Sequence, residues 1–153
     1  MSRPDFDRIL AELDQALLAC ASRDQAAQLA MEKLAAGLDA YRWVGVYWLN
    51  GETLELGPYV GAATDHTRIP VGRGVCGAAV AERRNIVVED VGELDNYLSC
   101  SLETKSEIVV LIRDETGRIL GQIDVDGHDI AAFDEQDEAF LDAVARRIAA
   151  FPE

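Results

Sequence analysis

The chain has 153 residues, of which 49% are hydrophobic and 27% charged, and its formal net charge is −14. This size predicts one domain with an adequate core, and the acidity argues against nucleic acid, whose phosphates it would repel. No apolar run approaches ~18 residues and no basic-plus-apolar leader is present, so we expect neither a membrane span nor secretion. The odd number of cysteines, three, favours a reducing, cytoplasmic location over a disulfide scaffold.

The first forty residues predict two helices. Leucine and isoleucine recur every fourth position within residues 5–20, which gives a helix an apolar stripe. Ser22 and Gln25 have the spacing of a capping box, so a second helix is expected to begin there and to end near Gly37.

The next segments predict a hairpin and a loop. Residues 42–49 are aromatic and β-branched, as in a strand, and the Asn50–Gly51 pair is a strong signal for a two-residue turn. We expect residues 53–56 to form the returning strand and Gly57–Pro58 to end it. Residues 61–72, rich in Gly, Ala, Thr and Pro, predict a loop.

The remaining elements complete an α+β pattern. We expect a short helix over 76–83, a short buried strand over 85–88 and a loop over 92–103 that carries Cys100. Two further strands and a helix follow, at 105–113, 118–126 and 134–150. The expected fold is a single α+β domain over 1–153: N-terminal helices in 5–38, an antiparallel sheet and pocket in 41–126, and a C-terminal helix in 134–150.

One segment points to thiol chemistry. Residues 67–77 place Cys76 among glycines and arginines, and Cys100 follows, seven residues before Glu107. Glycines let backbone N–H groups approach a ligand, and cationic neighbours favour the reactive thiolate. The segment predicts redox or nucleophilic chemistry on a small molecule, and the acidity of the chain would favour a ligand that bears an ammonium group.

Two aspartates two positions apart could supply a proton. Asp124 and Asp126 point to the same face of their strand, and two carboxylates so close cannot both ionise easily, so one pKa should rise. The alternative is that both are solvated strand residues, because Ile123 and Val125 on the opposite face could form the core alone.

These motifs together resemble the free methionine-(R)-sulfoxide reductases, enzymes with a GAF fold. The resemblance runs from Tyr41 to Ile148, and its motifs lie at 67–79, Cys100, 106–110, 121–126 and 133–137. It implies a GAF-like fold and thiol-dependent reduction of free methionine-(R)-sulfoxide through a cysteine sulfenic acid. It also implies no cofactor, with thioredoxin or a similar dithiol as reductant, and a homodimer is an open alternative to a monomer.

The resemblance also implies a role for each matching residue. Cys100 is the implied nucleophile, and Cys76 is a second catalytic cysteine in the pocket. Trp48 falls where an aromatic wall for the substrate methyl group is expected. The implied carboxylates are Glu107 and Asp126, for catalysis and substrate binding, and Asp124, for substrate binding.

One departure from the family leaves other functions open. The family usually has a resolving cysteine ten residues before Cys76, and His66 stands there. Cys20 lies on an apolar helix face and is expected in the core. The open alternatives are a GAF module that binds a small ligand without chemistry and a redox-sensing module. The two remaining cysteines and the carboxylates favour the enzyme.

Two further kinds of site were weighed. Arg68 and Arg73 could bind a substrate carboxylate or be exposed solubilising charges. A metal site is not expected, because no short ligand spacing connects the candidates Cys76, Cys100, His66 and His128.

Overall fold

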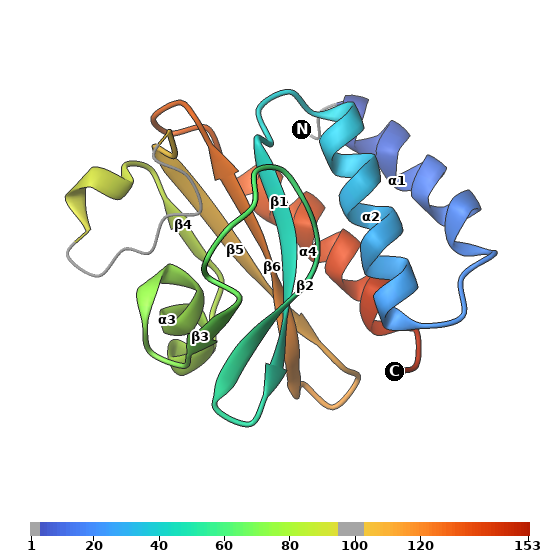
Figure 1. Cartoon of the computed structure of the whole chain (residues 1–153). Coiled ribbons are helices and arrows are strands. Elements are labelled where there is room, and N and C mark those ends of the chain that lie inside the picture. Colours follow the sequence, from blue (N-terminus) through green and yellow to red (C-terminus); the bar gives the residue numbers. More distant parts are fainter. Residues whose placement is uncertain (1–3, 95–102) are drawn as a thin grey trace.

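A single six-stranded antiparallel sheet organises the protein. The computed structural model describes residues 4–94 and 103–153. The strands lie in the order β3–β2–β1–β6–β5–β4 (Figure 1). Their bounds are β1 Trp43–Asn50, β2 Thr53–Val60, β3 Arg68–Pro70, β4 Ile86–Val88, β5 Ser106–Arg113 and β6 Ile119–Gly127. The expected α+β fold with an antiparallel sheet is confirmed.

The helices cover the two faces of the sheet unequally. Figure 1 shows α1, α2 and α4 together on one face and α3 on the other. Their bounds are α1 Pro4–Leu17, α2 Arg23–Gly37, α3 Gly74–Glu82 and α4 Glu135–Ala149, and a short 3-10 helix, η1, spans Val91–Glu93. Within the described ranges, no helix has the length and apolarity to cross a membrane.

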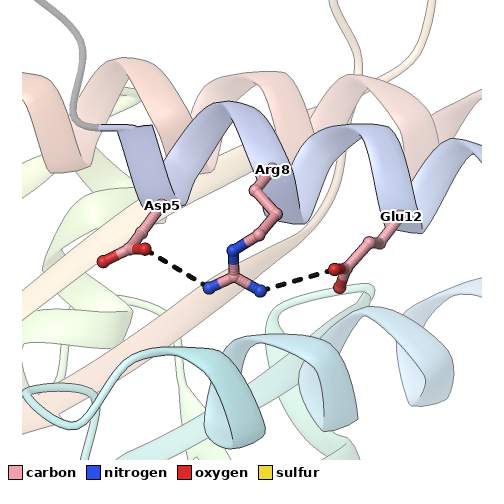
Figure 2. A network of polar contacts seen from close by, with 3 residues as sticks. All are labelled: Asp5, Arg8 and Glu12. Atoms are coloured by element: carbon pink, nitrogen blue, oxygen red, sulfur yellow. Dashed lines mark hydrogen bonds and ion pairs between the residues drawn. The ribbon is translucent and has the colours of Figure 1, made fainter.

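Helix α1 is held by its apolar stripe. Phe6, Leu13 and the residues between them on that face are buried. On the outer face the Arg8 guanidinium donates to Asp5 at 3.3 Å and to Glu12 at 3.4 Å (Figure 2). Exposed ion pairs of this kind contribute little to stability, so burial of the stripe, and not this network, holds the helix in place.

Side-chain caps begin helices α2 and α4. The Ser22 Oγ accepts the backbone N–H of Gln25 at 3.2 Å, as its position in the sequence predicts. Asp134 caps α4, and the Asp134 N–H donates to Oδ2 of Asp137 at 3.0 Å. The other oxygen of the buried Asp137 accepts the Tyr41 hydroxyl at 2.7 Å, which fastens α4 to the entry into the sheet.

Side-chain alternation along the strands divides the interior into two cores. The helix-face core joins α1, α2 and α4 to strand residues such as Val44, Val46, Ile123 and Val125. The α3-face core contains Cys76 with residues of the opposite strand parity, among them Trp43, Tyr47, Val109 and Leu111.

The sheet differs from the prediction at three points. Strand β2 continues past Gly57 and Pro58, because a register shift opposite Val46 places them in a bulge, where proline is tolerated. Strand β3 lies inside the predicted loop. Strand β4 is at the sheet edge and is only partly buried.

Candidate active site

Helix α3 holds Cys76 against the middle of the sheet. The thiol residue is 6% exposed. The preceding loop folds back on the helix, so the Gly72 N–H donates to the Gly77 carbonyl at 2.8 Å. A Cβ at Gly77 would lie 2.6 Å from the Pro70 carbonyl oxygen, so only glycine permits this approach. The Gln122 amide donates to the Cys76 carbonyl at 3.0 Å and ties α3 to β6.

Two buried carboxyl groups meet the Cys76 thiol. The Sγ atom lies 3.9 Å from Oε2 of Glu107, on β5. One ligand atom from each of Cys76, Glu107 and Asp124 lies within 4.8 Å of the others, and all three residues are buried. We call these three residues the thiol–carboxylate cluster.

The strand register explains how the carboxylates converge. Asp126 pairs with Glu107 across β6 and β5, and Asp124 is the next residue on the same face of β6. Asp124 and Asp126 are each 1% exposed, whereas Ile123 and Val125 belong to the helix-face core. The structure therefore excludes the interpretation of these aspartates as solvated strand residues and confirms that they share one face.

The electrostatics of the cluster include the raised aspartate pKa that the sequence predicts, with burial as its main cause. Burial raises the pKa of the Asp124 carboxyl, and hydrogen bonds with Glu107 and Cys76 lower it by less, so the protonated form is favoured. The Cys76 thiol thus lies beside two acidic groups, which the glycine and arginine context of the preceding loop did not predict. Arg68 instead forms an exposed ion pair with Glu55 at 2.9 Å, as the solubilising alternative predicts.

Trp48 does not join this cluster. It lies on the helix-covered face of the sheet, where its indole N–H donates to Asp24 at 3.1 Å. Trp48 and the carboxylates are therefore on opposite faces, and the proposed substrate wall needs another residue.

Trp43 is an aromatic residue on the same face of the sheet as the carboxylates, and the sequence analysis did not single it out. It pairs with Asp126 in the β1–β6 register, belongs to the α3-face core and stacks on Tyr59 with ring centroids 5.5 Å apart. Its indole N–H donates to the Ala62 carbonyl at 3.0 Å. A Cβ at Gly45 would lie 2.4 Å from the Trp43 ring, so the absent side chain makes room for the indole. The alternation of side chains along a strand could have indicated that Trp43 and Trp48 lie on different faces, because residues five positions apart face opposite sides.

The other candidate residues lie in different settings. Cys100 is outside the described residues. The carbonyl of His66 accepts the Tyr47 hydroxyl at 2.8 Å, and the residue is half-buried. His128 lies 3.4 Å from Glu103, and Cys20 packs, partly buried, against the helix-face core.

Known proteins match this chain in sequence and in fold. The GAF domain family matches residues 22–150. Free methionine-R-sulfoxide reductase of Saccharomyces cerevisiae is 39% identical over 109 residues, which are 69% of this chain and 60% of that protein. The enzyme of the same name from Escherichia coli is 41% identical over 99 residues, 65% of this chain and 59% of that protein. The chain thus spans about 60% of the length of these curated relatives.

A solved structure agrees over nearly the whole chain. The free methionine-R-sulfoxide reductase from Neisseria meningitidis, in complex with its substrate, superposes with a TM-score of 0.89 at 30% identity and covers 98% of this chain and 90% of that one. The sheet, the helices and these matches place the chain in the GAF domain family. Within that family it groups with the free methionine-R-sulfoxide reductases.

Proposed function

We propose that the protein reduces free methionine-(R)-sulfoxide to methionine with a cysteine thiol. The observation that carries the proposal is the approach of Glu107 Oε2 to within 3.9 Å of Cys76 Sγ, with Asp124 in the same buried cluster. A purely structural core would gain nothing from two carboxyl groups in such a place, since burying them is costly. The similarity to named reductases supports the same conclusion.

The chemical step transfers the sulfoxide oxygen to a cysteine. In the proposed mechanism the Cys100 thiolate attacks the substrate sulfur while a protonated carboxyl donates to the sulfoxide oxygen. The cysteine sulfur becomes a sulfenic acid, oxidised by two electrons, and the substrate sulfur becomes a thioether, reduced by two. Burial raises the pKa of Asp124, so the group of carboxyls that it forms with Glu107 and Asp126 can retain a proton, which Glu107 or Asp126 would deliver to the substrate.

The same carboxylates can select a free amino acid. A substrate ammonium group would meet the negative charge of Glu107 and Asp126, which the blocked amine of a peptide could not do. Trp43, adjacent to Asp126 in the register, is placed to contact the methyl group, the role that the sequence analysis gave to Trp48. These placements make the proposed substrate methionine sulfoxide itself, not the peptide-bound residue.

A thiol must then regenerate the enzyme. We propose that the sulfenic acid condenses with Cys76 or with an external thiol, releasing water, and that thioredoxin or a similar dithiol reduces the product by exchange. This cycle requires a reducing compartment such as the cytoplasm.

The decisive experiment measures turnover of separated R and S epimers of free methionine sulfoxide with dithiothreitol as reductant. Dithiothreitol can attack the sulfenic acid directly, so the assay tests the chemistry without requiring a resolving cysteine. We expect the free R epimer to be consumed and the S epimer to persist. An acetylated, amide-blocked sulfoxide serves as the control, and its consumption at a comparable rate would contradict the proposed substrate.

His66 gives specific support to a second candidate, a GAF module that binds a small ligand without chemistry. It stands where the family usually has its resolving cysteine. Saturable binding of methionine or its sulfoxide, with no turnover of either epimer in dithiothreitol, would favour this module.

A further inference from the structure

We propose that Cys76, Glu107 and Asp124 bind one thiophilic divalent cation, Zn²⁺ or Cd²⁺, and that the cation blocks the site. This inference adds regulation to the proposed function. The expected inhibition rests on that function. Binding itself is independent of that function.

The first argument is the geometry of the three ligand atoms. A tetrahedral Zn²⁺ site with Zn–S near 2.3 Å and Zn–O near 2.0 Å separates sulfur from oxygen by about 3.5 Å. The Cys76 Sγ to Glu107 Oε2 distance is 3.9 Å, and the Asp124 oxygen lies within 4.8 Å of both. Closing the first pair by a few tenths of an ångström, and the other pairs by up to about 1.5 Å, would bring the three atoms onto one cation.

The second argument is an unused acceptor inside the cluster. Asp124 is 1% exposed, and its Oδ1 accepts no hydrogen bond from the described residues. A buried carboxylate oxygen without a donor is costly, and a cation would satisfy it. Since the cluster can present two carboxylates and a thiolate, a divalent cation would also offset the mutual repulsion of three acidic groups in a poorly solvated place.

The ligand set predicts which cations bind. Thiolate is a soft ligand that selects Zn²⁺ and Cd²⁺ over Mg²⁺, which prefers oxygen alone. Binding replaces the thiol proton of Cys76 and the proton that Asp124 retains with bonds to the metal and releases both protons to solvent, without any change in oxidation state. Three protein ligands leave a fourth position for water, as in open zinc sites.

The bound cation should compete with substrate. Under the proposed function, the ammonium group of methionine sulfoxide approaches the same carboxylates, and a cluster that admits this substrate also admits a small cation. Low concentrations of Zn²⁺ should therefore inhibit turnover, and substrate should relieve the inhibition.

The experiment titrates Cd²⁺ into the full chain, reduced and then freed of reductant under anaerobic conditions. The readouts are calorimetric stoichiometry and the ultraviolet charge-transfer band of a cadmium–thiolate bond. We expect one Cd²⁺ per chain and no heat with Mg²⁺. Since loss of a mere supporting group costs about 10–100-fold in metal affinity, loss of the ligand in Cys76→Ser should weaken binding at least about a hundredfold and remove the band. Asp124→Asn should weaken binding and keep the band.

Matched variants make the result decisive. Cys20→Ser, away from the cluster, should bind Cd²⁺ as the parent does, and circular dichroism of each variant checks that it is folded. A band that survives in Cys76→Ser and disappears in Cys100→Ser would overturn the assignment, as would tight Mg²⁺ binding or no Cd²⁺ binding by the folded parent. Cd²⁺ binding without sulfoxide turnover would preserve this site and remove the proposed reductase activity.

Discussion

The Sγ atom of Cys76 and the Oε2 atom of Glu107 lie 3.9 Å apart, although 31 positions separate the two residues in the chain. Helix α3 carries the thiol and strand β5 the carboxyl group, so the contact depends on how the helix docks on the sheet. A carboxylate beside a thiol disfavours its ionisation. This relationship supports the proposal that Cys100, and not Cys76, is the attacking nucleophile.

The first prediction separates the two cysteines. We expect Cys100→Ser to abolish the chemical step and Cys76→Ser to retain at least part of a single turnover, because only the former removes the proposed nucleophile. Quenched single-turnover assays on both variants, with mass spectrometry of a trapped sulfenic acid, make the measurement. A trapped adduct found on Cys76 alone would reverse the assignment.

The second prediction concerns Glu107 and Asp126, paired across β5 and β6. Glu107→Gln and Asp126→Asn should each lower turnover about a hundredfold, the usual scale for loss of an acid–base group or charged anchor. Asp124→Asn should act more on substrate affinity. Steady-state assays with dithiothreitol on the three variants give kcat and KM separately. Near-normal rates in all three would place the reaction elsewhere in the molecule.

The third prediction compares the two tryptophans of β1. Trp43→Phe should raise KM about fivefold, since aromatic contacts contribute roughly 1 kcal/mol beyond burial. Trp48→Phe is the matched control. It loses the hydrogen bond to Asp24, which should cost stability of about 1 kcal/mol, and leaves KM unchanged. The opposite pattern of KM values would restore Trp48 as the substrate wall.

Strand periodicity was sufficient to predict one half of the site. A period of two places Asp124 and Asp126 on one face and Ile123 and Val125 on the other, and the structure has this arrangement. Their convergence with Glu107 depends on the pairing of β5 with β6, which the sequence does not state.

Other predictions failed where long-range contacts decide. The glycine and arginine context of Cys76 suggested a cationic setting, but α3 turns the thiol toward β5 and β6, where the carboxylates are. Gly57 and Pro58 predict the end of a strand, but strand β2 continues past them, because its pairing with β1 places both residues in a bulge. In both cases the packing of distant segments outweighs the local pattern.

The fourth prediction follows from the raised pKa of Asp124, which faces Glu107, Cys76 and the neighbouring Asp126. The unfolded chain releases this proton near its ordinary pKa of 3.8, whereas the folded protein retains it to higher pH. The contribution of Asp124 to the free energy of unfolding is therefore fully present below pH 3.8. It is lost as pH rises toward the pKa of the folded state, by at most about 1.4 kcal/mol per pH unit.

Asp124→Asn removes this titration. The variant should gain stability relative to the parent as pH rises from 4 to 8, as measured by urea denaturation at several pH values. Asp14→Asn is an exposed control: a hydrogen-bonded ion pair with Arg147 lowers the pKa of Asp14 below its ordinary 3.8, so the stability difference of this variant from the parent should stay nearly constant from pH 4 to 8. A difference between Asp124→Asn and the parent that is constant with pH would refute the assignment of a retained proton.

The last prediction concerns recycling at His66. The Tyr47 hydroxyl binds the His66 carbonyl at 2.8 Å, and Tyr47 belongs to the same α3-face core as Cys76. This hydrogen bond uses only the backbone of residue 66, so His66→Cys should leave the local fold intact and place a thiol where the family usually has one.

Without that thiol, Cys76 is the candidate resolving residue, but its carbonyl is fixed by Gln122 and its helix packs on the sheet. A disulfide needs Cα atoms within about 7 Å, a demand that a fixed helix meets poorly.

We therefore expect the parent chain to work with dithiothreitol and to recycle slowly with thioredoxin, which reduces a preformed disulfide. His66→Cys should increase the thioredoxin-coupled rate and leave the single-turnover rate unchanged, because the substitution affects only the step after oxygen transfer. The two rates are measured on both proteins, one before steady state and one in the coupled assay, and His66→Ser controls for loss of the imidazole. Fast thioredoxin recycling by the parent, together with a Cys76–Cys100 disulfide in its oxidised form, would instead identify Cys76 as the resolving thiol.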